Sequence, residues 1–234
     1  MNILITGASN GIGYELSKIL ASNSENTIIA LARNREKLNN LKENCQNTYP
    51  DSSLILFPFD LENGNWNTLD GLIREIGDID ILVNNAGLMI KGDFDKLSDE
   101  DWLRLYKVNL LGPVKLIRKL LPFMGKNIKG HIVNISSMAG FQGSVKFQGT
   151  SAYAASKAAL ANLTEVLAAE FAENNIAVNC LALGAVQTDM LSKAFPDYAA
   201  PLNPLQMAEF IADFCLNGHR CFNGKILPVA LSTP

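Results

Sequence analysis

Short apolar runs alternate along this chain with longer segments in which apolar residues recur at helical spacing. Most of the runs are apolar at every position rather than at every second one, which is typical of strands buried on both faces of a sheet. The pattern predicts strands at residues 2–6, 27–32, 54–57, 79–83, 131–135, 176–181 and 225–229. It predicts helices at residues 11–21, 35–44, 66–76, 99–124, 152–173 and 205–216.

This alternation predicts an α/β fold, a doubly wound parallel sheet of about seven strands with helices on both faces. Consecutive parallel strands are then joined by right-handed crossovers. The sequence contains no internal repeat, low-complexity tract or linker-like boundary, so we expect a single domain over residues 1–234.

Two places depart from the regular pattern. Pro113 lies inside the fourth predicted helix and should kink or break it, because proline has no backbone N–H to donate. Residues 187–205 show no clear period and contain three prolines among apolar residues. Loops of that length in a compact domain are usually functional, so this segment is predicted to be a substrate lid.

The composition narrows the choice of partners. The net charge of −3 argues against nucleic acid or an anionic membrane surface as a partner. No apolar stretch approaches the roughly 20 residues that a membrane helix needs, and the first strand follows the initial methionine too closely for a signal peptide. We therefore expect a cytoplasmic protein that binds neither nucleic acid nor membrane.

The cysteine pattern gives no sign of a metal site. Cys45, Cys180, Cys215 and Cys221 form no C-x-x-C pair, and the chain has only two histidines. Four reduced thiols are the expectation, with no zinc bound.

A glycine-rich segment, Thr6-Gly7-Ala8-Ser9-Asn10-Gly11-Ile12-Gly13, directly follows the first predicted strand. Glycines in such a turn permit positive φ and let the backbone approach a pyrophosphate, and the helix that follows presents free N–H groups. Such turns also occur for purely structural reasons, but the position between strand and helix favours a nucleotide site. Its predicted ligands are Gly7, Ser9, Asn10, Gly11, Ile12 and Gly13.

A tyrosine and a lysine form the second candidate site. Tyr153 and Lys157 are four residues apart in a predicted helix, so they share a face. A free phenol has a pKa of about 10, and a neighbouring ammonium lowers it, which lets the phenol exchange protons as a general acid or base. Taken alone, the pair is better explained as a core tyrosine beside a solvated lysine.

These motifs, with three others in the same order, resemble the short-chain dehydrogenase/reductase family over essentially the whole chain. The others are Asn84-Asn85-Ala86-Gly87, Asn109 in the fourth helix, and Ile135-Ser136-Ser137 at the end of the fifth strand. The resemblance implies a Rossmann-like fold and hydride transfer between a nicotinamide cofactor and a ketone, aldehyde or secondary alcohol. It also implies a homodimer or homotetramer.

The resemblance implies four catalytic residues. Tyr153 is the general acid or base, and Lys157 lies beside it. Ser137, rather than its neighbour Ser136, orients the substrate oxygen. Asn109 holds a water in a proton relay that runs through the lysine to solvent, although a polar side chain that bonds a bent helix backbone would also explain it.

The residues after the second strand bear on the cofactor. No acidic side chain stands there to accept from an adenosine ribose hydroxyl, and Arg33 can offer a planar fork to a 2′-phosphate. We therefore expect NADP(H) in preference to NAD(H). Arg33 could instead cap a surface turn, and Asn10 occupies the place in the glycine loop where the family often has a basic residue.

The family pattern extends to further cofactor contacts. Asp60 resembles the aspartate beside the adenine amino group, although it could also cap a helix. Thr188 resembles the threonine that meets the nicotinamide amide, but Leu183 stands where the family usually has proline. The cofactor-binding residues predicted outside the glycine loop are Arg33, Asp60, Leu61, Asn85, Ala86, Gly87, Tyr153, Lys157 and Thr188.

The substrate is less defined by the sequence. The predicted lid carries Met190, Phe195 and Tyr198, which suit an apolar or medium-sized substrate, and residues 141–150 form a longer loop than the family usually has. The branch of 3-oxoacyl-carrier-protein reductases is one specific candidate, although its common Asp-Gly-Gly ending is absent. A catalytically silent nucleotide-binding or sensing protein is the alternative from another class, and an epimerase is a third, for which the C-terminal region is short.

Overall fold

Seven parallel strands form one sheet in the computed structural model, which describes residues 1–231. They are β1 (Asn2–Thr6), β2 (Thr27–Ala32), β3 (Ser53–Pro58), β4 (Ile81–Asn84), β5 (Gly130–Ser137), β6 (Ile176–Leu183) and β7 (Ile226–Val229). Their order across the sheet is β3-β2-β1-β4-β5-β6-β7, so the chain reverses its direction of travel between β1 and β4. The predicted doubly wound parallel sheet is confirmed.

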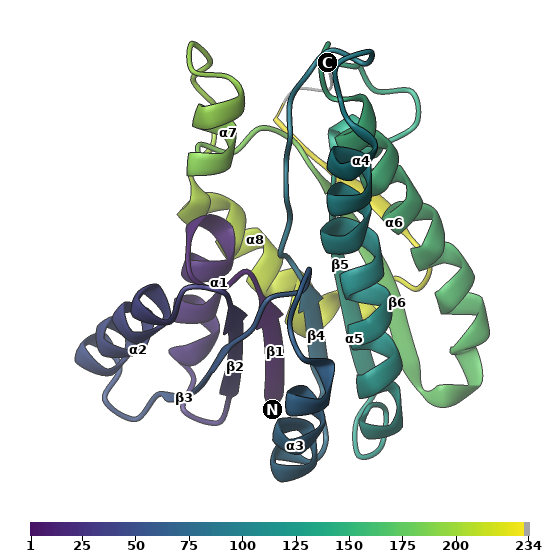
Figure 1. The fold of residues 1–234 in the computed structure, drawn as a ribbon. Helices are drawn as coiled ribbons and strands as arrows, with labels where there is room; N and C mark the ends of the chain where they lie inside the picture. The colour runs from purple at the N-terminus through teal and green to yellow at the C-terminus, as the bar shows by residue number, and fades with distance from the viewer. Residues whose placement is uncertain (232–234) are drawn as a thin grey trace.

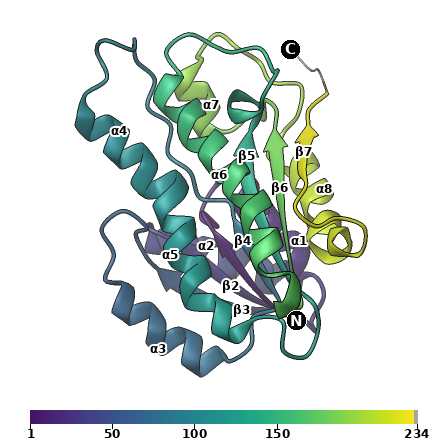
Figure 2. The same ribbon diagram turned by 90° about the vertical axis from the view of Figure 1, so that its right-hand side faces the viewer.

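Helices cover both faces of this sheet (Figures 1 and 2). One face carries α1 (Gly11–Ala21), α2 (Arg35–Thr48) and α8 (Pro204–Asn217). The other carries α3 (Trp66–Ile76), α5 (Gly112–Leu120) and α6 (Ser151–Glu170). Two further helices, α4 (Asp99–Tyr106) and α7 (Asp189–Ala194), stand at the carboxyl end of the strands, on opposite sides of it. Within residues 1–231, no helix is both long and apolar enough to span a bilayer.

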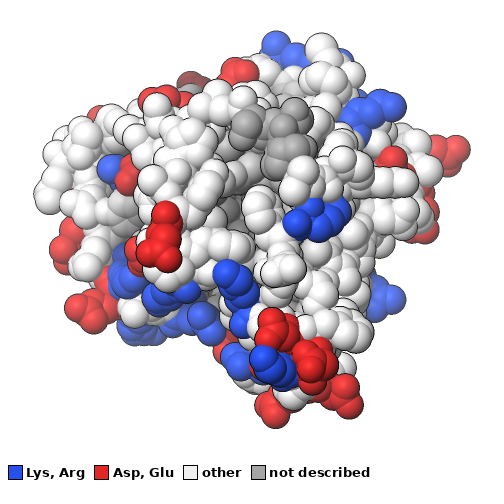
Figure 3. All heavy atoms as spheres, turned by 90° about the horizontal axis from the view of Figure 1, so that it is seen from above, with Lys and Arg blue, Asp and Glu red and all other residues white. Residues whose placement is uncertain are grey.

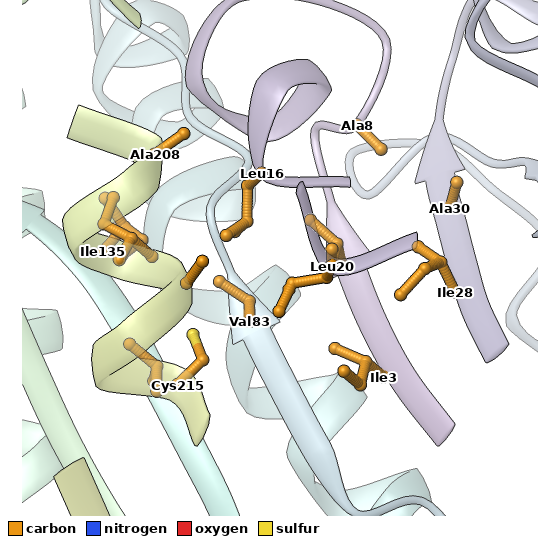
Figure 4. Close-up of a cluster of buried hydrophobic side chains, with 14 of the residues drawn as sticks. Ile3, Ala8, Leu16, Leu20, Ile28, Ala30, Val83, Ile135, Ala208 and Cys215 are labelled. Atoms are coloured by element: carbon orange, nitrogen blue, oxygen red, sulfur yellow. The ribbon is translucent and has the colours of Figure 1, made fainter. Parts of the chain in front are cut away.

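The continuous apolar runs are explained by two cores, one on each side of the sheet. Ile3 and Ile28 face α1 and α8, as Figure 4 shows, whereas Leu4 and Ile29 face the opposite helices. All four side chains are fully buried. Because successive strand residues point to opposite faces, a strand covered on both sides must be apolar at every position.

The prediction of one continuous helix over residues 99–124 is wrong. The chain runs as α4, then a π-helical turn over Lys107–Leu111, then α5, and ends in a 3-10 turn over Leu121–Phe123. Pro113 lies in the first turn of α5 and cannot donate to the carbonyl four residues earlier, which belongs to Asn109. The wider π turn replaces that bond, with the Gly112 N–H donating to the Lys107 carbonyl.

The segment 187–205 contains an element that the sequence pattern did not predict. Thr188 caps the short helix α7 by accepting a hydrogen bond from the Leu191 N–H at 3.3 Å. The segment returns to the body through a parallel bridge between Val186 and Leu202. One and a half turns of helix are too short to show a hydrophobic period, so only the N-capping threonine marked its start.

A histidine is buried where β5 begins. His131 is fully buried, and its Nδ1 lies 2.9 Å from the Cys215 carbonyl, to which it must donate. Its Nε2 therefore accepts from the Asn179 amide at 3.1 Å. With both nitrogens engaged in the neutral tautomer, burial lowers the pKa of His131 to about 4.

This histidine should make the fold sensitive to acid. Because the folded pKa lies below the ordinary value of 6.5, the unfolded chain takes up the extra proton between pH 6.5 and 4, and the free energy of unfolding falls as the pH is lowered through that window. The loss attributable to His131 should reach about 3 kcal/mol near pH 4. Urea unfolding of the wild type and of His131→Gln at several pH values measures it, because the difference between the two isolates the histidine from the carboxylates. A difference that stays constant from pH 7 to pH 4 would contradict this account.

Candidate active site

A cleft with a volume of about 640 Å³ opens at the carboxyl end of the strands. It lies over the point where the sheet order reverses between β1 and β4, the position at which open α/β sheets bind ligands. Its walls are the segments that follow β1, β2, β3, β4, β5 and β6, together with the start of α6. Every site residue predicted from the sequence lines this cleft except Gly13 and Asn109, which lie behind its wall.

The glycine loop forms the floor at one end. Gly7 and Gly11 have φ values of +71° and +56°, which residues with a side chain rarely adopt. A Cβ on Gly13 would lie 2.4 Å from both the Gly7 carbonyl oxygen and the Asn85 Nδ2. Only glycines permit this close approach of the β1–α1 turn to the segment after β4.

The N-terminus of α1 is left free for an anion. Its N-cap residue, Asn10, makes no capping bond, and no acidic side chain lies in the first turn. The Asn10 amide donates instead to Asp189 Oδ2 at 2.7 Å, on the first residue of α7. Unsatisfied N–H groups at the positive end of a helix, beside glycines with no Cβ, fit a phosphate group.

The segment after β4 is fixed to the end of β1. The Asn85 amide donates to the Thr6 carbonyl at 2.9 Å, and the Ala86 N–H donates to the Thr6 hydroxyl at 3.0 Å. These bonds place Asn85, Ala86 and Gly87, which are partly buried, along the cleft wall.

Basic side chains gather at the opposite end of the cleft from the tyrosine. Arg33 lines the wall after β2, and Lys37 in the first turn of α2 joins it. Neither is paired with a carboxylate within residues 1–231. Figure 3 looks down on this end of the molecule and shows Lys and Arg atoms gathered toward the lower left, the side on which α2 lies. The sequence analysis missed Lys37, although its position one helical turn after Arg33 was a usable signal.

Asp60 and Leu61, which follow β3, form the part of the cleft wall next to Arg33 and Lys37. Asp60 Oδ1 accepts from the Glu62 N–H at 2.9 Å and so closes a local turn. It does not cap α3, whose N-cap is Asn65. The helix-capping alternative for Asp60 is therefore wrong, and its second carboxylate oxygen remains free to accept.

The tyrosine and lysine of α6 lie at the other end of the cleft, beside the end of β5. Burial raises the pKa of Tyr153, and hydrogen bonding with Ser137 opposes this rise. The expected lowering of the Tyr153 pKa is thus wrong for this state of the site, because removal from water outweighs neighbouring groups.

Lys157 is almost entirely buried, with 3% of its surface exposed. Its ammonium donates to the Ile135 carbonyl at 2.8 Å, and burial lowers its pKa to about 8. This burial excludes the alternative interpretation, in which Lys157 is a solvated lysine beside a core tyrosine.

The two serines at the end of β5 have separate positions. The Ser136 hydroxyl donates to the Lys157 carbonyl at 2.8 Å and joins β5 to α6. The Ser137 oxygen accepts from the Ala139 N–H at 3.1 Å, so its hydroxyl hydrogen is the donor in the hydrogen bond with Tyr153.

Asn109 sits in the π-helical turn and is fully buried. Its amide nitrogen donates to the Leu88 carbonyl and to Ser156 Oγ, both at 2.9 Å, while Oδ1 accepts from the Leu88 N–H at 2.8 Å. Asn109 Oδ1 and Lys157 Nζ both lie within 4 Å of the point where a Gly87 Cβ would stand. Asn109 therefore lies beside the lysine but outside the cleft.

The segment after β6 forms a further wall of the cleft. Leu183 ends β6, pairs with Val229 and lines the cleft, so the family's missing proline leaves a regular strand end here. Thr188 lines the cleft next to Gly11, whose Cβ would lie 3.3 Å from Thr188 Cγ2. Other lining residues that the sequence did not single out are Leu31, Ala32, Asn34, Phe59, Leu88, Met89, Val108, Met138, Ala139, Phe147, Thr150, Gly184, Ala185, Val186, Asp189 and Leu191.

Comparisons with known proteins agree with this site. The family described as short chain dehydrogenase matches residues 1–199. Nodulation protein G of a Rhizobium species is 36% identical over 193 residues, which are 81% of this chain and 75% of that protein. The 3-oxoacyl-acyl-carrier-protein reductase FabG of Thermotoga maritima is 33% identical over 190 residues, 81% of this chain and 76% of that one. The crystal structure of a short chain dehydrogenase from Burkholderia cenocepacia in complex with NADP has a TM-score of 0.85 at 26% identity and covers 97% of this chain and 95% of that chain.

The chain therefore belongs to the short-chain dehydrogenase family, a class of NAD(P)-dependent oxidoreductases, as its motifs predicted.

The packing of the glycine loop yields a test that needs no substrate. Gly13→Ala should lower the free energy of unfolding by about 1–3 kcal/mol, because its methyl group meets backbone and an amide that cannot retreat. Gly71→Ala is the matched control. That glycine is exposed in α3 with nothing within 4 Å of its Cβ position, so alanine should leave stability unchanged or raise it by up to about 1 kcal/mol. Thermal and urea unfolding measure both, and equal effects would refute the packing argument.

Proposed function

We propose that this protein is an NADP(H)-dependent oxidoreductase that interconverts a ketone or aldehyde and the corresponding alcohol. The observation that carries the proposal is that one cleft holds both a phosphate-binding floor and the Ser137, Tyr153 and Lys157 side chains. The Burkholderia relative, crystallised with NADP, supports the same assignment.

The residues of the cleft divide between the parts of the cofactor. Gly7, Gly11 and the free N-terminus of α1 hold the pyrophosphate, with Ser9, Asn10 and Ile12 around it, and Gly13 supports the turn from behind. Asp60 and Leu61 border the adenine, and Asn85, Ala86 and Gly87 line the adjoining wall. Lys157 and Thr188 hold the nicotinamide half. When bound, NADPH supplies the hydride that adds to the carbonyl carbon.

The Arg33 side chain determines the preference between NADP(H) and NAD(H). Its guanidinium, just after β2, forms no ion pair with the described residues 1–231, and Lys37 adds a second positive charge nearby. An acidic residue at this position would favour NAD(H) instead. NADP(H) is therefore preferred over NAD(H).

The chemistry at the substrate oxygen uses three side chains. The hydroxyl hydrogen of Ser137, which otherwise bonds Tyr153, donates to the substrate oxygen and orients it. Tyr153, whose raised pKa keeps its proton at neutral pH, delivers that proton to the oxygen as the carbonyl carbon takes up hydride, and the product is the alcohol. In the reverse direction, the phenolate of Tyr153 takes the proton back.

Lys157 and Asn109 return the proton to Tyr153. The ammonium of Lys157 stabilises the phenolate left after transfer, and Asn109 beside it holds the water that connects this pair with solvent. Asn109 also fixes the chain at Leu88, so its structural and relay roles coexist.

The segment 187–205 is proposed as the substrate lid, since its α7 lies directly over the cleft and is tied to the glycine loop by the Asn10–Asp189 bond. The protein is also proposed to form a homodimer or homotetramer. Leu103, Leu111 and Val166 are large apolar side chains exposed on α4, the π turn and α6. A second copy that covers these elements would bury them.

A second candidate is reduction of 3-oxoacyl groups on a carrier protein, which the Thermotoga relative favours. NADPH oxidation with a 3-oxoacyl thioester, compared with simple ketones, separates this candidate from the general proposal.

The tyrosine provides the main test. Tyr153→Phe should lower kcat for carbonyl reduction by about a hundredfold or more, because general acid catalysis typically contributes that much, while the Kd of NADPH stays within about twofold. Tyr49→Phe, outside the cleft, should leave both unchanged. NADPH absorbance and fluorescence titration measure the two quantities. Retained turnover in Tyr153→Phe would remove the phenol from the mechanism, and a wild type that binds NADPH but reduces no carbonyl would favour the silent nucleotide-binding protein.

The arginine tests the cofactor assignment. Arg33→Ala should weaken NADPH binding by about ten- to hundredfold, the worth of a charge-assisted hydrogen bond, with little change for NADH. Arg35→Ala is the control, since Arg35 is exposed two residues away and does not line the cleft. Isothermal titration with both cofactors gives the Kd values. A wild type that binds NADH as tightly as NADPH would reject the preference.

A further inference from the structure

A partly buried ion pair connects the turn after β3 with α4. Arg104 Nε in α4 donates to Oε1 of Glu62, which follows Asp60 by two residues, at 3.0 Å. The Glu62 side chain is only 10% exposed, whereas that of Arg104 is 40% exposed. Fully exposed ion pairs contribute little to stability, but a carboxylate held this far from water is left without a counter-charge when its partner is removed. The pair should therefore hold the turn against α4.

The backbone of Glu62 fixes the direction of the Asp60 side chain. The Glu62 N–H donates to Asp60 Oδ1 at 2.9 Å, and the Gly64 N–H donates to the Asp60 carbonyl at 2.7 Å. A Cβ on Gly64 would lie 2.4 Å from that carbonyl oxygen, so the turn is tightly closed. One carboxylate oxygen of Asp60 is thus engaged, and the position of Glu62 sets where the other oxygen can accept a hydrogen bond.

The same turn packs closely against the start of α5. A Cβ on Gly112 would lie 3.2 Å from Leu61 Cβ and 3.4 Å from Leu61 Cδ1. Leu61 and Val108 both line the cleft, and Val108 precedes Asn109 in the π turn. A shift of the turn would therefore move this part of the cleft wall together with the Asp60 carboxylate.

Other acidic groups near Arg104 do not replace Glu62 as its partner. Asp101, three residues earlier on α4, is held by Ser98, whose N–H and hydroxyl both donate to Asp101 Oδ2, at 3.1 and 2.8 Å. Within residues 1–231, the only ion pair of Arg104 is the one with Glu62. Neither member of this pair lines the cleft, so any effect on a bound molecule must pass through the turn.

We propose that Glu62 and Arg104 are positioning residues that aim the Asp60 carboxylate at the amino group of the cofactor's adenine. An amino group donates to a carboxylate oxygen, whereas a purine that carries a carbonyl oxygen at the same place is repelled by it. The pair thereby makes the cleft selective for adenine without touching the base. This inference rests on the proposed function, in which Asp60 and Leu61 border the adenine.

The hypoxanthine analogue of NADPH, in which an oxygen replaces the adenine amino group, is the probe. The wild type should bind NADPH about tenfold or more tightly than the analogue, the worth of a hydrogen bond to a charged group. Arg104→Gln should weaken NADPH binding by about fivefold and change binding of the analogue by less than about twofold, so the preference shrinks. Isothermal titration gives the four Kd values. A preference that Arg104→Gln leaves unchanged would overturn the proposal.

The ion pair between Lys119 on α5 and Asp70 on α3 provides the matched control. It also joins the α5 segment to the chain that follows β3, its side chains are 24% and 39% exposed, and neither residue lines the cleft. Lys119→Gln removes one ion pair and one positive charge without touching the turn, so both Kd values and their ratio should stay unchanged. If Lys119→Gln reduces the preference as much as Arg104→Gln does, the effect is a general loosening of these helices and the positioning role is refuted.

Variants at Glu62 test whether the two side chains act through one contact. Glu62→Ala should reduce the preference for NADPH as Arg104→Gln does, and the double variant should reduce it no further. Glu62→Gln keeps an oxygen that accepts from Arg104, so its preference should stay within about twofold of the wild type. Additive losses in the double variant, or a Glu62→Gln variant that behaves like Glu62→Ala, would overturn the paired role.

The outcomes separate this inference from the function on which it rests. If the wild type binds neither NADPH nor its analogue, the proposed cofactor and function are refuted. If the wild type binds both equally, or if the variants keep its preference, the proposed function stands and the positioning role is refuted. Circular dichroism checks the folding of each variant, and the Kd ratio within one folded variant is independent of its stability.

Discussion

The structure depends on one close approach of backbone to backbone, where the sheet order reverses. Gly13 packs against the Gly7 carbonyl and the Asn85 amide with no room for a Cβ, and Asn85 and Ala86 in turn bond Thr6. This contact brings the turn after β1 and the segment after β4 together at the carboxyl edge of the sheet. The glycine loop, the free end of α1 and the wall formed by Asn85, Ala86 and Gly87 all meet at this point of the cleft.

The chemistry of the site comes from groups that the fold has removed from water. Tyr153 keeps its proton because burial raises its pKa, and Lys157 is brought toward neutrality because burial lowers its pKa to about 8. In the proposed mechanism a neutral acid and an easily titrated base lie on one helical face. The π turn before α5 completes this arrangement, since it carries Asn109, whose Oδ1 lies, like the Lys157 ammonium, within 4 Å of the Cβ position of Gly87.

The entrance to the site is made of parts that differ in origin. The floor and the α6 residues come from motifs shared with the family, whereas the Phe147–Phe195 contact joins residues 141–150 to the segment 187–205. Loops tolerate change because they add little to the core. Changes in these two segments can therefore reshape the entrance while the sheet that holds the glycine loop and α6 stays as it is.

The sequence by itself determined the sheet and the strand positions, because strands buried on both faces must be apolar throughout. Its glycine loop and its tyrosine–lysine pair marked two parts of the cleft wall. It could not determine the direction of the Tyr153 pKa shift, which depends on how much water the surrounding segments exclude. It missed Lys37 beside Arg33, the short helix α7, and the π turn that splits the fourth predicted helix. It gave no sign that Phe147 meets Phe195. Lys37, α7 and the π turn are local features whose signals in the sequence are short. The Tyr153 environment and the Phe147–Phe195 contact instead depend on segments far apart in the chain, which only the tertiary structure brings together.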